Sequence, residues 1–219
     1  MRWSISDIAD AIEAGLRARA AADDAEQAVY GFDTLAELDL HPLLQQALRT
    51  AGFGVWPEQR YPSDRERGRK SEGKRCDIVL TPAPPVGEEP LPVRDPELRG
   101  TLFEGADACD PEDAYWLEVK TVAQHETTGP FARYAAELLA PVAHDVRKLW
   151  SDPLVHHGGL LIVLFTAEPR VAEHDLMVWH ERCLQKGFPV GPPALRGVEL
   201  TDRVGNAWCQ VAVFGVRGV

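Results

Sequence analysis

Two short apolar segments of this sequence carry charged residues that are typical of phosphate chemistry assisted by a metal ion. Asp77 lies in the segment CDIVL, and Glu118 and Lys120 lie in the segment YWLEVK. If both segments are strands, the two-residue period of a strand places Glu118 and Lys120 on one face and Val119 on the other. A divalent cation that acts on a phosphodiester prefers hard oxygen ligands, and carboxylates on neighbouring strands supply them.

An acid two positions before a lysine is by itself weak evidence, because the 219 residues include 34 acids. A second triplet of this kind, at 72–74, lies in a polar stretch without strand pattern, and its context excludes it. Glu118 and Lys120 instead have apolar neighbours, where a charge is costly unless a metal, a partner charge or a hydrogen bond compensates it. The structural alternative is that Asp77 is a strand-end acid and Lys120 a lysine at the sheet edge with a buried stem.

The elements that position these residues follow from apolar periodicity. It predicts helices over 4–21, 35–51, 131–150 and 171–186, and strands over 53–61, 76–80, 115–122, 159–165 and 207–216. Pro141 should kink or split the third helix. The stretch 81–113 holds seven prolines and has no apolar period, which indicates a long surface insertion with little regular structure.

The order of helices and strands predicts an α/β fold in three layers, with a mixed central sheet flanked by helices. A length of 219 residues is typical of a single domain. Within it we expect an N-terminal helical extension at 1–34, the insertion loop at 81–113, and C-terminal helix and strand additions at 167–219.

CDIVL followed by YWLEVK resembles motifs II and III of the PD-(D/E)XK nucleases, the restriction-endonuclease-like superfamily. The resemblance in fold pattern covers about residues 35–166. It implies the restriction-endonuclease-like core and a Mg²⁺ or Mn²⁺ ion bound by Asp77, Glu118 and the Val119 carbonyl. It also implies that Lys120 orients or deprotonates the attacking water, so that hydrolysis is direct and has no covalent enzyme intermediate.

Many members of that superfamily add an acid from the helix before the first strand. Glu37 is the matching residue here, because it precedes an inward stripe of leucines in the helix predicted over 35–51. The alternative is structural, since Thr34 and Glu37 also have the spacing of a capping box, and Pro42 can start the main helix near residue 41.

The strongly basic stretch of the chain leads directly into the strand of Asp77. Its side chains could hold a nucleic-acid backbone near the metal through phosphate contacts, and a solvated hairpin loop is the alternative. The bases are Arg60, Arg65, Arg67, Arg69, Lys70, Lys74 and Arg75. Gln124 and Lys148 are expected to be ordinary surface residues, with phosphate contact as their alternative.

The net charge of −11 excludes a general nucleic-acid-coating role, so contact with DNA must be local or must come from a homodimer or a partner protein. Four widely spaced cysteines without a CxxC pair argue against a zinc ribbon and a disulfide scaffold and favour a reducing compartment. No window approaches the length of a membrane span, and no signal peptide is recognisable, so we expect a soluble, cytoplasmic protein without a membrane partner.

Two hypotheses about function follow. The first is a Mg²⁺- or Mn²⁺-dependent phosphodiester hydrolase that acts as a DNA endonuclease. The second is a catalytically silent member of the same fold, which serves as a protein-binding or assembly subunit through the acidic, proline-rich insertion at 81–113.

Overall fold

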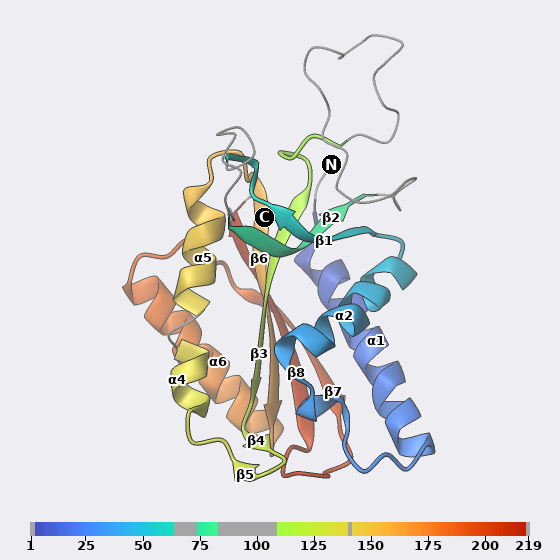
Figure 1. Ribbon diagram of the computed structural model, residues 1–219. Coiled ribbons are helices and arrows are strands. Elements are labelled where there is room, and N and C mark those ends of the chain that lie inside the picture. The colour runs from blue at the N-terminus through green and yellow to red at the C-terminus, as the bar shows by residue number, and fades with distance from the viewer. Residues whose placement is uncertain (1–2, 64–73, 83–108, 140–141, 218–219) are drawn as a thin grey trace.

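A mixed β-sheet with helices on both faces forms the centre of the molecule (Figure 1). The computed structural model describes residues 3–63, 74–82, 109–139 and 142–217. Within these residues the main sheet has six strands in the order β1-β2-β3-β6-β8-β7. They are β1 (Gly54–Arg60), β2 (Arg75–Thr81), β3 (Tyr115–Ala123), β6 (His157–Thr166), β7 (Pro193–Glu199) and β8 (Trp208–Arg217). The neighbours β3 and β6 are parallel, and the other neighbouring pairs of this sheet are antiparallel.

The helices divide between the two faces of the sheet (Figure 1). On one face lie α1 (Ile5–Ala25) and α2 (Glu37–Thr50), joined through the short 3-10 helix η1 (Phe32–Thr34). On the other face lie α4 (Tyr134–Leu139), α5 (Val142–Ser151) and α6 (Pro169–Gln185). Each helical layer buries its apolar stripe in a separate core against the sheet. The predicted α/β class and its flanked mixed sheet are therefore confirmed at this level, whereas the restriction-endonuclease-like layout stays a prediction.

Strand β6 is the buried central strand that holds β3 in the sheet. Its residues after His157 are all buried, which fits a continuous apolar run covered on both faces. It pairs with β3 on one side and β8 on the other, so it holds β3, and with it Glu118 and Lys120, in the interior of the sheet.

The structure has two features that were not predicted, and both lie outside the strongest apolar periods. Strand β7 and the small hairpin of β4 (His125–Glu126) and β5 (Gly129–Pro130) were not predicted, because neither has a clear alternation of apolar and polar residues. The helical region predicted over 131–150 is found as two helices, α4 and α5, in agreement with the expected kink or split. Most of the predicted insertion, 83–108, and Pro141 lie outside the described residues.

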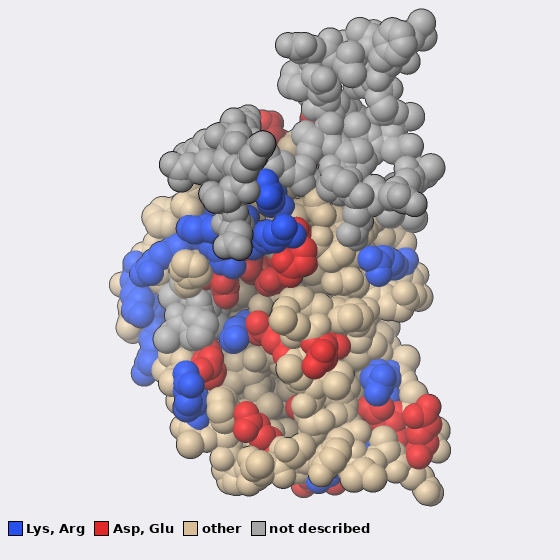
Figure 2. Space-filling model, in the orientation of Figure 1, with Lys and Arg blue, Asp and Glu red and all other residues tan. Residues whose placement is uncertain are grey.

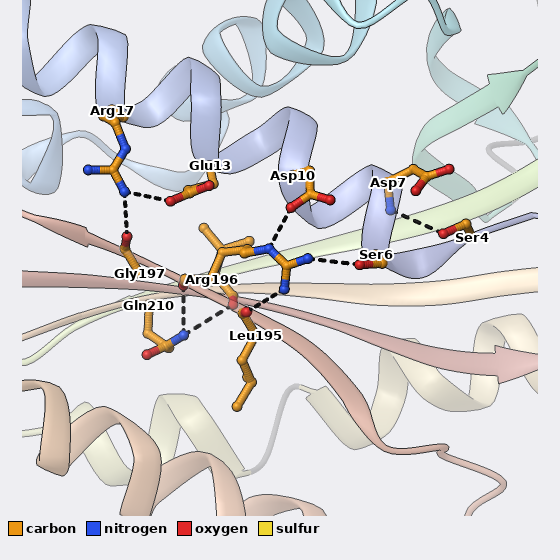
Figure 3. Close-up of polar contacts among 11 residues, drawn as sticks. Ser4, Ser6, Asp7, Asp10, Glu13, Arg17, Leu195, Arg196, Gly197 and Gln210 are labelled. Carbon is orange, nitrogen blue, oxygen red and sulfur yellow. Dashed lines mark hydrogen bonds and ion pairs between the residues drawn. The ribbon is translucent and has the colours of Figure 1, made fainter.

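Polar contacts hold α1 against the edge strand β7 (Figure 3). The Arg196 guanidinium of β7 contacts Asp10 at 2.5 Å and donates to the Ser6 hydroxyl at 2.8 Å. Arg17 of α1 donates to the carbonyl of Gly197 at 3.1 Å. The N-terminal segment 1–34 is therefore in contact with the C-terminal segment 167–219, because α1 packs on both β7 and β8. Strand β8 in turn pairs with β6, which joins these segments to the centre of the sheet.

In the part of the chain that the structure describes, none of the helices has both the length and the apolar character needed to cross a membrane.

Candidate active site

The candidate site lies where β2 and β3 stop pairing. The antiparallel register of these strands is recorded as far as Ile78 opposite Leu117, although β2 begins earlier and β3 continues further. The next pair in this register is Asp77 opposite Glu118. In place of a strand partner, the side chain of Asp77 receives a hydrogen bond, because the Val119 amide donates to its Oδ2 at 2.7 Å.

Beyond its pairing with β2, strand β3 has an open edge whose backbone amides lack a strand partner among the described residues. A second carboxylate accepts a hydrogen bond from this edge. The Thr121 amide donates to Oε2 of Glu37 at 2.8 Å, and the same oxygen lies 3.1 Å from Nζ of Lys120. Glu37 comes from the first turn of α2. Two edge amides of β3, two residues apart, are therefore satisfied by the carboxylates of Asp77 and Glu37, which fixes both acids beside the strand that carries Glu118 and Lys120.

Glu118 is held by a buried network of side chains that includes residues of α5, on the face of the sheet opposite α2. Its side chain is only 1% exposed. The Tyr61 hydroxyl donates to Oε1 at 2.5 Å, and Nζ of Lys148 on α5 lies 2.8 Å from Oε2. Lys148 also pairs with Asp145 at 2.9 Å. Both oxygens of Glu118 thus have partners, as a carboxylate in an apolar environment requires.

The electrostatics of this network follow from its burial. Burial, together with the neighbouring charge of Asp77, raises the pKa of Glu118 to about 8 against the opposing effects of Lys148 and Tyr61. Burial disfavours the charged form of Lys148, but the adjacent Glu118 carboxylate outweighs it, so the pKa of Lys148 lies above its ordinary value. Burial, with the nearby Cys76 and Glu118, raises the pKa of Tyr61, which keeps its hydroxyl as a hydrogen-bond donor at neutral pH.

The structure contains a group of residues that could hold a metal ion. One ligand atom from each of His41, Glu58 and Asp77 lies within 4.8 Å of the other two. His41 is on α2, Glu58 on β1 and Asp77 on β2. The predicted ligand set of Asp77, Glu118 and Val119 shares only Asp77 with this cluster. A metal-binding capacity near Asp77 therefore agrees with the predicted cofactor, whereas the identity of the ion stays a prediction.

Two structural expectations for Glu37 and its helix are wrong. The capping-box alternative fails because α2 begins at Glu37 with Ala36 as N-cap and no side-chain cap hydrogen bond, while the Thr34 hydroxyl donates to the carbonyl of Gly31. Pro42 does not start the helix but lies inside it. The carboxylate of Glu37 is instead engaged by Lys120 and the Thr121 amide, so its partners lie on β3.

The prediction for Lys148 is also wrong. It was expected to be an ordinary surface residue, but its side chain is 14% exposed and pairs with the buried Glu118. Gln124 has a structural contact, since its side-chain oxygen accepts a hydrogen bond from the Ala167 amide at 2.9 Å. Both contacts join segments far apart in sequence, and neither periodicity nor composition indicates such a partner.

Three further residues were missed by the sequence analysis, namely His41, Glu58 and Tyr61. For His41 a signal exists, because it follows Glu37 by four residues and therefore lies on the same side of the helix. Glu58 has φ 53°, a value that is uncommon for a residue other than glycine and that sequence periodicity does not predict. Tyr61 directly follows β1, where its ring stacks on Trp116 at 5.5 Å between centroids.

The basic stretch is described only at its two ends. Arg60 at the end of β1 stands opposite Arg75 at the start of β2, and Lys74 precedes it. The guanidinium of Arg75 donates to the Glu58 carbonyl at 3.3 Å. The remaining four bases, Arg65, Arg67, Arg69 and Lys70, lie outside the described residues, so the proposed phosphate contacts rest on Arg60, Lys74 and Arg75.

Charges of both signs lie close together on the face of the molecule shown in Figure 2. Basic side chains gather over its upper and left part, and acidic side chains lie beside them towards the centre. A groove of about 410 Å³ starts at Glu37 and Thr121 and runs along His125 and Glu126. The Oγ1 atom of Thr121 and the Nδ1 atom of His125 are buried there without a hydrogen-bond partner in the described part of the chain.

Comparisons with family models, curated proteins and solved structures find no match for this chain.

Proposed function

We propose that this protein is a metal-dependent phosphodiester hydrolase of the PD-(D/E)XK class and that it cuts DNA. The observation that carries the proposal is the position of Asp77 and Glu118, which adjoin the last pair of β2 and β3, Ile78 and Leu117, with the Val119 amide bonded to Asp77. Lys120 follows two residues later on β3, with the acid Glu37 beside it. Lys120 with two acids, Asp77 and Glu37, at the open edge of β3, and a third acid, Glu118, buried beside them, are the groups that the resemblance to this superfamily implies.

The residues around Asp77 fit a divalent cation. The Val119 amide bonds to Oδ2 of Asp77, and the other carboxylate oxygen can serve as a ligand. His41 next to it has a buried Nε2 atom without a hydrogen-bond partner among the described residues. Asp77, together with either Glu118 or the pair His41 and Glu58, would hold the ion. When bound, Mg²⁺ or Mn²⁺ would supply a Lewis acid for the phosphodiester.

Lys120 supplies the positive charge on the side of the attacking water. Its ammonium group is anchored by Glu37 at 3.1 Å and its side chain is 16% exposed, so it is held in place and remains in reach of a substrate. In the proposed reaction Lys120 orients the water and offsets the negative charge that develops on the phosphate. Glu37 acts as a positioning residue for Lys120, because it contacts the Lys120 ammonium and the backbone of β3.

Lys148 has a different task in this scheme. It neutralises Glu118 from the α5 layer at 2.8 Å and thereby keeps a second carboxylate at the position opposite Asp77. Without that partner a charged Glu118 would be unfavourable at a site that is only 1% exposed. Lys148 therefore positions Glu118 and does not touch the substrate.

One observation favours the second hypothesis, a catalytically silent subunit. Both lysines of the site are already paired with site acids, Lys120 with Glu37 and Lys148 with Glu118. Such internal pairing satisfies the charges without a metal ion or a substrate. The two hypotheses differ in one measurable respect, which is whether the purified protein hydrolyses any nucleic acid.

Replacing Asp77 with asparagine tests the proposed function. Asparagine keeps the shape of Asp77 and an acceptor for the Val119 amide but removes the charge that binds a cation. We expect the rate at which supercoiled plasmid DNA is nicked, in Mg²⁺ or Mn²⁺, to fall at least ~100-fold, because even an outer partner of a metal ligand contributes 10- to 100-fold. The measurement is the loss of supercoiled plasmid with time on an agarose gel.

Asp202→Asn is the matched control. Asp202 also accepts a backbone hydrogen bond, from Gly205 at 2.6 Å, and it is exposed. We expect this variant to nick DNA at the wild-type rate. Undiminished activity of Asp77→Asn would contradict the assigned site, and absence of cleavage of DNA and RNA by the wild-type protein would favour the silent subunit.

A further inference from the structure

Three potential metal ligands from three different elements converge beside the β1–β2 hairpin. The ligand atoms of His41, Glu58 and Asp77 lie within 4.8 Å of one another. Two ligand atoms on opposite sides of an ion with bonds of ~2.1 Å are about 4.2 Å apart, so small side-chain rotations suffice to close the group around one cation. Because the elements are α2, β1 and β2, the sheet and the helix above it position all three ligands.

His41 is the observation that points most directly to a ligand. The residue is only 5% exposed, and its Nε2 atom has no hydrogen-bond partner in the described part of the chain. A buried imidazole nitrogen without a partner is unfavourable, because it has lost its hydrogen bonds to water. Leu40 and Leu44 of the same helix are fully buried in the core beneath α2. His41 is buried as well, but it is polar and lies next to the carboxylates of Glu58 and Asp77.

Glu58 adds a second feature that core packing does not require. Its φ of 53° lies in the left-handed region, which is unfavourable for residues with a side chain beyond glycine. It stands between Pro57, which pairs with Ile78, and Gln59, which pairs with Cys76, so it is opposite Asp77 in the register. The Glu58 side chain is exposed, and within the described residues no ion pair to it is present.

We propose that His41, Glu58 and Asp77 form a binding site that selects a divalent transition-metal ion, such as Mn²⁺, over Mg²⁺. One imidazole and two carboxylates leave the remaining coordination positions to water or to phosphate oxygens. The inference deepens the proposed function, on which it rests for the role of the ion, but the binding itself requires no substrate.

The selectivity follows from the donor types. Mg²⁺ prefers oxygen ligands throughout and keeps much of its hydration shell. An imidazole nitrogen binds the divalent transition metals better, and their affinity for a mixed nitrogen and oxygen site increases along the series from Mn²⁺ to Cu²⁺. A site that used Asp77 and Glu118 alone would offer only oxygen and would not show this preference. The difference between Mn²⁺ and Mg²⁺ therefore reports whether His41 is a ligand.

The test is direct binding of Mn²⁺ to the full chain in the absence of nucleic acid. Free Mn²⁺ gives an electron paramagnetic resonance signal that is lost on binding, and Mg²⁺ is added as a competitor. We expect Mn²⁺ to bind at least ~10-fold more tightly than Mg²⁺. The variants His41→Asn and Glu58→Gln should each weaken Mn²⁺ binding at least ~10-fold, while His41→Asn should change Mg²⁺ binding less than about 3-fold.

One control variant and one alternative variant complete this test. Glu181→Gln removes an exposed carboxylate on α6, in the layer opposite α2, and should leave Mn²⁺ binding unchanged. If His41→Asn fails to fold, as judged by circular dichroism, Glu58→Gln decides, because the Glu58 side chain is exposed and glutamine keeps its size. Equal affinity for Mn²⁺ and Mg²⁺, or Mn²⁺ binding that is insensitive to Glu58→Gln, would overturn the metal site.

The outcomes also separate this inference from the proposed function. Selective Mn²⁺ binding without cleavage of any nucleic acid would support the metal site and reject the nuclease. Cleavage of DNA that depends on Asp77, together with Mn²⁺ binding unaffected by Glu58→Gln, would support the nuclease and reject the metal site.

Discussion

Replacing Lys120 with methionine is expected to lower the single-turnover rate of DNA nicking by ~10³-fold, the middle of the range for a group that moves a proton or offsets charge in the transition state. Methionine keeps the unbranched, apolar stem of the side chain and removes only the ammonium group that Glu37 holds at 3.1 Å. Because the loss concerns the transition state, the affinity for DNA should change much less than the rate. A time course at saturating Mg²⁺ and a filter-binding titration measure the two quantities separately.

Lys186→Met is the control for this variant. Lys186 is exposed at the C-terminal end of α6, so its removal changes the net charge equally but leaves the site intact. The control should cut DNA at the wild-type rate. A Lys120→Met variant that is as active as the control would show that Lys120 has no part in the chemistry, and an equal fall in DNA affinity would assign it to substrate binding alone.

The second large effect concerns stability. At a pH above the value of about 8 that is the pKa of Glu118, the variant Lys148→Met leaves a charged Glu118 buried without its cation, and breaking a buried ion pair in this way costs about 3–5 kcal/mol in free energy of unfolding. The variant also removes the contact of Lys148 with Asp145, whose side chain is 15% exposed, so this second loss is smaller than the loss at Glu118, whose side chain is 1% exposed. Urea denaturation of the wild type and the variant at the same pH measures the difference.

The double variant Lys148→Met/Glu118→Gln tests the cause. A neutral glutamine no longer needs the cation, so the double variant should recover most of the stability lost in Lys148→Met. If the two single variants instead add up in the double variant, the ion pair between Lys148 and Glu118 is not the reason for the loss.

The pH dependence of the same variant has a defined sign. The ordinary pKa of a glutamate is 4.5, and burial raises the pKa of Glu118 to about 8. Between these values the native state keeps a proton that the unfolded chain releases, so the contribution of Glu118 to stability is present below the lower value and is lost as the pH rises through the higher one. Without Lys148 the native pKa rises further, and the destabilisation should be larger near pH ~9 than near pH ~6.

The strands of the site were predictable because each is a compact apolar segment. CDIVL and YWLEVK were recognisable as neighbouring strands, and their antiparallel pairing from Ile78 to Leu80 places Asp77 opposite Glu118. Glu37 was also predicted as a candidate site residue, although its contacts with Lys120 and the Thr121 amide were not predicted. The contacts of Glu37 with β3 depend on how far the pairing of β2 and β3 extends, and periodicity does not determine that length.

The rest of the site depends on contacts between layers. Lys148 reaches Glu118 across 30 positions of sequence, and its place in an amphipathic helix gave no indication of a buried partner. His41 could have been noticed from its distance of four residues to Glu37, but the proposal that it is a metal ligand depends on Glu58. Glu58 in turn owes its position to a backbone conformation that is rare outside glycine and that no local pattern predicts.

The claim that the open edge of β3 carries a metal-dependent phosphodiesterase site is tested by the dependence of DNA cleavage on added metal. The purified wild-type protein is stripped of metal with a chelator, and the rate of plasmid nicking is then measured as Mg²⁺ or Mn²⁺ is added. Nicking that is absent in the stripped protein and rises to a plateau with either ion is the predicted result. Nicking that continues at full rate in excess chelator, or no nicking at any concentration of either ion, would contradict the claim.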